Sequence, residues 1–212
     1  MRILSDQDGA MFLEDTVHPV SCERIGLKDG MQKMFDDGVS ALDSNTDLDA
    51  VVRDGARNEL EKERHICDGI ADSLYVVNGD AWSNRIDTEA SQPFAKSIDL
   101  LVPVDEDGLS SILFVEGKLG LAPRELRSRL RNPSYADVVE KYCETKSKVC
   151  RERPVPVCHT MDLIVPVAVC EVARNTFARR NITNTICSIV PMDAWNFLSG
   201  IGAMRSEGTL SE

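Results

Sequence analysis

Three charged side chains near the middle of the chain have the types and the spacing of a hydrolytic site. Asp99 lies within an otherwise apolar stretch, residues 97–104, and Glu116 and Lys118 stand one residue apart at the end of the next apolar stretch. Carboxylate oxygens are the ligands that Mg²⁺ and Mn²⁺ prefer. A bound divalent cation lowers the pKa of a coordinated water, and a neighbouring lysine can orient that water or help to deprotonate it. The sequence therefore predicts Asp99 and Glu116 as metal ligands and Lys118 as the residue that activates water.

A β-hairpin is the element that must bring these residues together. Residues 97–104 and 109–117 are rich in large apolar and β-branched side chains, and Asp105-Glu106-Asp107-Gly108 stands between them. Two such runs joined by a short segment that contains Asp-Gly are typical of a hairpin.

The register of this hairpin decides whether the charged side chains share one face. With Val104 opposite Leu109, Asp99 faces Phe114 and lies diagonal to Glu116, and all three charged side chains point to the same side of the sheet. A turn longer by one residue would reverse the parity and separate them. The favoured register predicts that two carboxylates and one ammonium converge.

This cluster carries excess negative charge, and burying an uncompensated charge costs several kcal/mol. A divalent cation would offset it, which favours a metal site. The alternative is a structural ion pair among Asp99, Glu116 and Lys118 in an unrelated α/β protein.

In these features the chain resembles the PD-(D/E)XK nuclease superfamily. In that family an Asp on one strand and a Glu-x-Lys on the paired strand coordinate Mg²⁺ for phosphodiester cleavage. Asp99, Glu116 and Lys118 match the motif, whereas Ile98 stands where the family name has proline. The resemblance implies a Mg²⁺-dependent nuclease.

The resemblance also implies a fold, over roughly residues 47–190. It is an α/β (α+β) domain with a restriction-endonuclease-like core, in which helices flank a mixed sheet with a central antiparallel hairpin. Family members often add a glutamate from the first core helix. Glu59 and Glu63 lie on the apolar stripe of a helix predicted to begin near Asp47, and Glu59 is the preferred fourth catalytic residue.

The chain divides into three segments by pattern. Residues 1–46 are predicted to form an acidic N-terminal extension, irregular or partly helical, because Asp-Gly pairs at 29–30 and 37–38 resemble turns. Residues 47–200 form the core domain, and residues 201–212 form a polar tail. Outside the hairpin we expect helices over 47–70, 123–149, 171–180 and 193–198, strands over 74–77, 161–169 and 185–190, and a loop over 80–95.

Charge is distributed unevenly along the 212 residues. The formal net charge is −11, and residues 1–99 hold 21 acids and 10 bases, whereas the remainder holds 14 of each. Within residues 118–153 there are ten Lys and Arg against five acids. This segment is either a solvated helix face or a patch for nucleic-acid phosphates. The expected phosphate contacts are Arg124, Arg127, Arg129 and Arg131.

Composition limits the class of protein. Apolar stretches are far shorter than the roughly 20 residues of a membrane-spanning helix, and the N-terminus shows no secretory signal. The seven cysteines include no CxxC pair, so we expect reduced thiols and a cytoplasmic protein without membrane partners.

Two functions remain open. The first is a Mg²⁺- or Mn²⁺-dependent nuclease, with DNA rather than RNA as the expected substrate. The second is a catalytically inactive nuclease-fold interaction protein, such as an immunity or regulatory subunit of a mobile-element or defence system. That protein would bind a basic protein partner through its acidic residues 1–99.

Overall fold

The computed structural model describes residues 1–4, 6–17, 24–70, 72–89, 96–120, 133–151, 154–158, 160–178 and 187–193. The strands are β1 (Arg2–Ile3), β2 (Arg24–Gly26), β3 (Tyr75–Asn78), β4 (Leu100–Glu106), β5 (Leu109–Gly117), β6 (Met161–Val165) and β7 (Cys187–Pro191). The helices are α1 (Asp6–Thr16), α2 (Leu27–Asp43), α3 (Ala50–Glu63), α4 (Gly79–Glu89), α6 (Pro133–Val149) and α7 (Val167–Ala178), and a 3₁₀ helix, η1 (Arg64–Gly69), follows α3.

One mixed sheet runs through the described part of the chain. Seven strands take part, in the order β2-β3-β4-β5-β6-β7, and β1 pairs with β4 beside β3. Strands β2 to β5 pair antiparallel, whereas β5, β6 and β7 pair parallel. Parallel neighbours need a crossover, and α6 and α7 supply the two crossovers. The protein is therefore a mixed α/β domain whose central hairpin is β4–β5.

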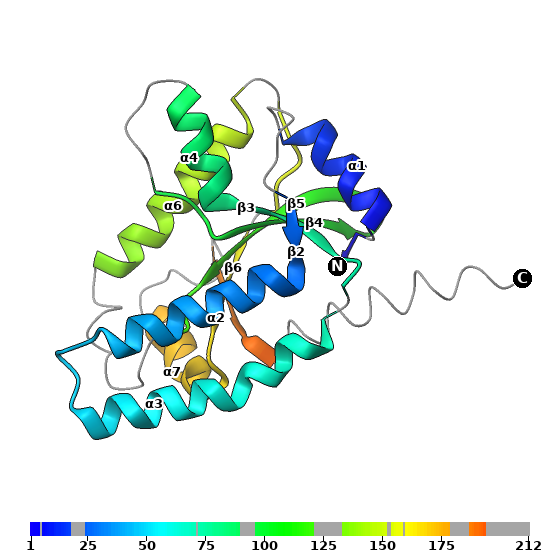
Figure 1. The fold of residues 1–212 in the computed structure, drawn as a ribbon. Helices are drawn as coiled ribbons and strands as arrows, with labels where there is room; N and C mark the ends of the chain where they lie inside the picture. Colours follow the sequence, from blue (N-terminus) through cyan, green and yellow to red (C-terminus); the bar gives the residue numbers. More distant parts are fainter. Residues whose placement is uncertain are drawn as a thin grey trace, which may run out of the picture.

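Helices cover both faces of the sheet (Figure 1). Side chains of α1, α4, α6 and α7 share one buried cluster, and those of α2, α3 and η1 share another. The strands feed both clusters by alternation: Leu101 and Phe114 belong to the first, whereas Leu100 and Val115 belong to the second. Because both faces are buried, β4 and β5 are almost continuously apolar, and a charged residue there is costly unless it has partners.

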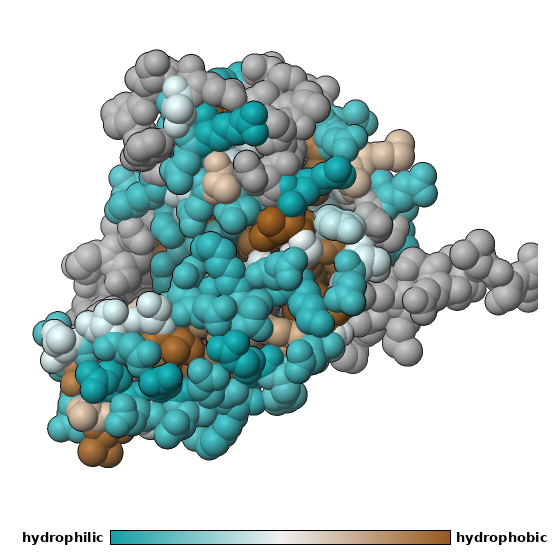
Figure 2. All heavy atoms as spheres, viewed as in Figure 1, coloured by the Kyte–Doolittle hydropathy of each residue, from teal (hydrophilic) through white to brown (hydrophobic). Residues whose placement is uncertain are grey.

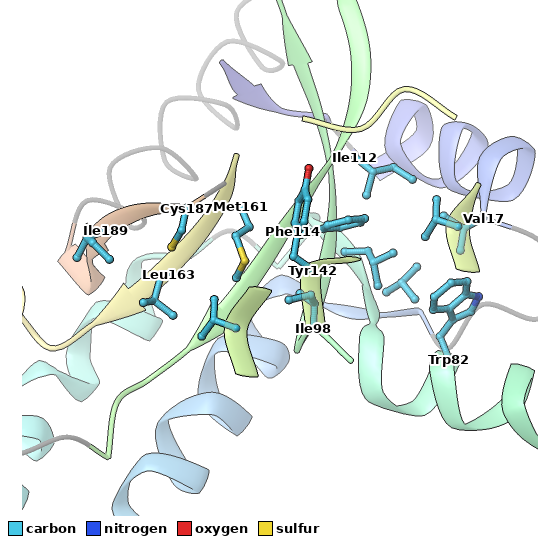
Figure 3. Close-up of a cluster of buried hydrophobic side chains, with 14 of the residues drawn as sticks. Val17, Trp82, Ile98, Ile112, Phe114, Tyr142, Met161, Leu163, Cys187 and Ile189 are labelled. Atoms are coloured by element: carbon cyan, nitrogen blue, oxygen red, sulfur yellow. The ribbon is translucent and has the colours of Figure 1, made fainter. Parts of the chain in front are cut away.

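An aromatic pair fixes α6 on the hairpin. The ring centroids of Phe114 and Tyr142 lie 5.6 Å apart at an interplanar angle of 70°, an edge-to-face arrangement. Figure 3 shows the two rings in the buried cluster that also contains Ile98 and Trp82. This contact holds the middle of α6 against the end of β5 that lies away from the hairpin turn.

The first 46 residues, predicted as a separate extension, contribute two strands and two helices to this architecture. The Asp-Gly pairs at 29–30 and 37–38 lie inside α2 and form no turn there. Gly30 and Gly38 are buried on the face of α2 that packs on the sheet. Because glycine has no side chain, it permits close packing as well as turns, and here packing is its use.

Most other predicted elements are present near their expected positions. Two segments are exceptions. The helix α4 occupies Gly79–Glu89 within the predicted loop over 80–95, and α7 begins at Val167 within the strand predicted over 161–169. The predicted helical stretches over 123–132 and 194–198 lie outside the described residues. Among the helices that the structure describes, none combines the length and the apolar character needed to cross a bilayer.

Candidate active site

The β4–β5 turn is shorter than the favoured register predicts, and it lies closer to Leu109 in the chain. Asp107 and Gly108 have φ angles of 54° and 85°, and Glu106 pairs with Leu109. Two positive φ angles in a two-residue loop match the type I′ turn, for which Asp-Gly is a preferred sequence. The predicted register, with Val104 opposite Leu109, was wrong by two residues.

This shift brings the two carboxylates closer than predicted. Leu100 pairs with Val115, so the position before it places Asp99 directly opposite Glu116 and not diagonal to it. An even shift keeps the parity of the strands, and the prediction of a shared face therefore holds. Asp99 itself lies just before β4 begins, where the Gly79 N–H donates a 2.9 Å hydrogen bond to its main-chain oxygen.

Glu116 is the buried centre of the charged cluster. Its side chain has 0% exposure, and its Oε1 accepts hydrogen bonds from Lys118 Nζ at 2.5 Å and from Lys141 Nζ at 2.7 Å. Its Oε2 is buried and accepts no hydrogen bond from the described residues. The cluster therefore carries less excess negative charge than the sequence predicted, because Lys141 supplies a second ammonium group.

Asp99 is held in a state that resists ionisation. The Gly117 N–H donates a 2.7 Å hydrogen bond to its Oδ2. Burial first and the charge on Glu116 second raise the pKa of Asp99 from 3.8 to about 7. The Gly117 hydrogen bond and the ammonium groups of Lys141 and Lys118 oppose this rise. Because Asp99 titrates near neutral pH, an added positive charge nearby would strongly favour its ionised form.

These groups line a pocket of about 280 Å³. Its walls come from α2 (Met34, Asp37, Gly38, Ala41), from the hairpin and the residues after it (Asp99, Glu116, Gly117, Lys118, Leu119, Gly120) and from α6 (Lys141). The α2 wall approaches closely because it has a glycine: a Cβ at Gly38 would lie 2.7 Å from Leu119 Cβ. The pocket therefore combines three carboxylates with two lysines at one end of the sheet.

Two contacts of α6 position Lys141. Tyr142 packs on Phe114, which lies two residues before Glu116 on the same sheet face. Thr145 Oγ1 accepts a 3.2 Å hydrogen bond from the Ile98 N–H. Because Lys141 immediately precedes Tyr142 and both anchors lie beside the hairpin end, its side chain reaches Glu116.

The carboxylates of this pocket could hold a divalent cation that prefers oxygen ligands and takes few of them from the protein. Among the described residues there is no group of three or more His, Cys, Asp and Glu side chains with the geometry of a metal site. Mg²⁺ is commonly held by one or two carboxylates, while waters and substrate phosphate complete its octahedron. The unpartnered buried oxygen of Glu116 and the opposed Asp99 provide such a pair.

The structure places the remaining predicted site residues elsewhere. Glu59 lies on α3, 55% exposed, with its carboxylate 2.5 Å from Lys62 Nζ, and it does not line the pocket. Glu63 accepts hydrogen bonds of 3.1 and 3.2 Å from the Val167 N–H at the start of α7. The predicted phosphate contacts Arg124, Arg127, Arg129 and Arg131 lie outside the described residues.

Asp37 and Lys141 are the charged pocket residues that the sequence did not assign to the site. Asp37 comes from α2, and its Oδ2 lies 2.8 Å from Lys33 Nζ. A signal for α2 was present, because Leu27, Met31 and Leu42 follow helical spacing. Lys141 stood in the basic segment, but local pattern does not show which lysine of a helix meets a distant strand.

Comparison with protein-family models, with curated proteins and with solved structures found no match to this chain.

Proposed function

We propose that the protein is a Mg²⁺- or Mn²⁺-dependent nuclease of the PD-(D/E)XK kind, which hydrolyses phosphodiester bonds in the cytoplasm. One observation carries the proposal: Asp99 and Glu116 line the same pocket, and Glu116 has a buried, unpartnered oxygen and an ammonium beside it. A purely structural ion pair has no use for the unpartnered oxygen, which costs free energy to bury.

Each residue has a distinct role in this proposal. Asp99 and Glu116 would hold the cation. When bound, the ion supplies positive charge for the phosphate oxygens and lowers the pKa of a coordinated water. Lys118, 28% exposed and hydrogen-bonded to Glu116, faces the pocket, where it orients the attacking water and stabilises the charge that develops on the phosphate.

The order of elements around the pocket supports the same proposal. Apart from α3, η1 and α4, which are inserted among them, the elements follow in the chain as the helix α2, the antiparallel strands β3, β4 and β5, the helix α6 and the parallel strand β6. This is the succession of helix, antiparallel strands, helix and strand that the resemblance implies. We infer that α2 takes the place of the first core helix and that Asp37 is its acidic residue at the site.

Nucleic acid is the proposed substrate, and DNA is expected before RNA. The arginine-rich segment follows in the chain soon after Lys118, and we propose Arg124, Arg127, Arg129 and Arg131 as its phosphate contacts. The net charge of −11 opposes indiscriminate binding to polyanions, which favours a restricted substrate.

A cleavage assay tests the proposal. Single- and double-stranded DNA and RNA are incubated with the protein and Mg²⁺, Mn²⁺ or chelator. We expect metal-dependent cleavage that Asp99→Asn, Glu116→Gln and Lys118→Ala each abolish. Asp54→Asn on α3, where the side chain is 68% exposed, is the matched control and should keep full activity. Cleavage that survives Glu116→Gln would exclude this pocket as the active site.

A binding assay separates phosphate contacts from chemistry. With Ca²⁺ to block cleavage, Arg127→Ala with Arg131→Ala should weaken binding to every sequence alike and flatten the salt dependence by about one unit of slope per lost contact. Lys118→Ala should leave binding largely intact, because its role lies in the transition state.

One observation favours the second candidate, a nuclease-fold interaction protein without catalysis. Glu116 is already paired with two lysines, so the pocket holds together without metal. The face that α2 and α3 present is mostly hydrophilic (Figure 2), in the acidic half of the chain. This candidate predicts no nucleic-acid binding at low salt and capture of a basic protein through residues 1–99.

A further inference from the structure

Two lysines from different elements bind one oxygen of Glu116. Lys118 follows β5, and Lys141 comes from α6, and their Nζ atoms lie 2.5 and 2.7 Å from the same Oε1. Both ammonium groups are therefore close enough to repel each other. The second oxygen of the same carboxylate stays buried without a hydrogen bond from the described residues.

This arrangement is poor as a structural ion pair. One lysine would neutralise Glu116, and the better use of two would be one on each oxygen. Lys141 has a side-chain exposure of only 17%, so its ammonium is desolvated as well. Its pKa is nevertheless raised: burial lowers it, but the charge and hydrogen bond of Glu116 and the charge of Asp99 outweigh burial.

Lys141 thus brings a positive charge into contact with one of the two carboxylates of the pocket. The negative charges of Glu116 and Asp99 both raise the pKa of Lys141, and Lys141 lines the same pocket. Lys118 belongs to the hairpin itself, where its main-chain N–H donates to Ile164 O at 2.8 Å, and its backbone is fixed beside Glu116. Lys141 reaches in from the neighbouring layer, so its side chain can leave without disturbing the sheet.

We propose that Lys141 is a built-in counter-cation of the metal site, whose positive charge on one oxygen of Glu116 opposes the binding of a divalent ion at the other. The inference rests on the proposed function. Lys141 keeps the metal-free pocket charge-balanced and stable, and it weakens the affinity for the divalent ion. It therefore sets the metal concentration at which the site fills, and a protein with Lys141 stays inactive at low metal.

A Mn²⁺ titration at pH 8 of chelator-treated full-length protein, followed by the electron paramagnetic resonance of the free ion, tests this. Replacing Lys141 by methionine removes a positive charge within contact distance of a metal ligand, so the Kd for Mn²⁺ should fall at least about tenfold. Lys141→Gln, which retains a hydrogen-bond donor, should act in the same direction. The matched control is Lys62→Met, which removes a charge from α3, where the side chain is 69% exposed and lies outside the pocket. It should change the Kd less than about threefold.

Asp99→Asn is also made in wild type and in the Lys141 variants. The Mn²⁺ binding that this substitution removes is the binding at the proposed site, and melting curves confirm that each variant is folded. Tighter Asp99-dependent binding of Mn²⁺ in the Lys141 variants than in wild type supports the inference. The same holds if binding is measurable in these variants and too weak to measure in wild type. Equal or weaker binding in a folded variant, with Asp99-dependent binding in wild type, overturns the inference and leaves the metal site standing. Absence of Asp99-dependent binding in every variant overturns the inference and the proposed function together.

Discussion

Replacement of Asp99 by asparagine should stabilise the metal-free protein at alkaline pH. Its carboxyl is buried opposite the fully buried Glu116, and its pKa is raised to about 7 by burial first and by the Glu116 charge second. Ionising Asp99 therefore costs folding free energy. Asparagine has the same shape, keeps an oxygen for the Gly117 N–H, and carries no charge.

The sign and size follow from proton linkage. Because the folded state holds a proton on Asp99 up to about pH 7 and the unfolded state releases it near 3.8, the folded state binds more protons between these values. The free energy of unfolding therefore falls as pH rises through this window. From pH 5 to pH 8 the loss from Asp99 is on the order of 3 kcal/mol, since one pKa unit is worth about 1.4 kcal/mol.

The assay is urea unfolding of wild type and Asp99→Asn with chelator present, at pH 5, 6, 7 and 8. The difference in unfolding free energy, variant minus wild type, isolates the Asp99 contribution because other titrating groups are common to both proteins. It should increase by on the order of 3 kcal/mol from pH 5 to pH 8, which corresponds to roughly 6–12 °C in melting temperature for a protein of this size.

Asp54→Asn, which removes an exposed α3 carboxylate, controls for the loss of one surface charge. A difference that stays flat between pH 5 and pH 8, or one that turns against the variant at pH 8, would refute the burial argument. It would mean that Asp99 is solvated or compensated in the folded protein.

Three further outcomes follow from the structure. Mn²⁺ at millimolar concentration should raise the melting temperature of wild type by mass action on the folded state. Asp99→Asn should abolish this rise, and equal melting points with metal and with chelator would count against the site. Gly79→Ala should destabilise by about 2 kcal/mol, because a Cβ there would lie 1.9 Å from the main-chain oxygen of Ile98, next to Asp99. A denaturant midpoint equal to wild type would contradict the close approach. Lys148→Met should cost about 3–5 kcal/mol, because Lys148 Nζ lies 2.7 Å from Asp87 Oδ2 and the two side chains are 7% and 1% exposed. A loss below 1 kcal/mol in calorimetry would show that this buried pair is dispensable.

The sequence by itself determined the core of the site. Period-two parity is a local property, so two apolar strands and an Asp-Gly turn are enough to place the side chains of Asp99, Glu116 and Lys118 on one face. The exact register was not accessible in the same way, because four consecutive residues offered more than one two-residue turn. The positive φ angles of Asp107 and Gly108 settle it.

Only the tertiary structure decided what surrounds those three residues. Asp37 reaches the pocket because α2 packs closely on the residues that follow β5, and the glycine that permits this approach resembles a turn signal in the sequence. Lys141 reaches Glu116 because Tyr142 packs on Phe114. Such contacts join residues far apart in the chain, and no periodicity within one segment encodes which of them meet. For that reason the charge balance of the site, with two lysines on one buried carboxylate, is a property of the assembled fold.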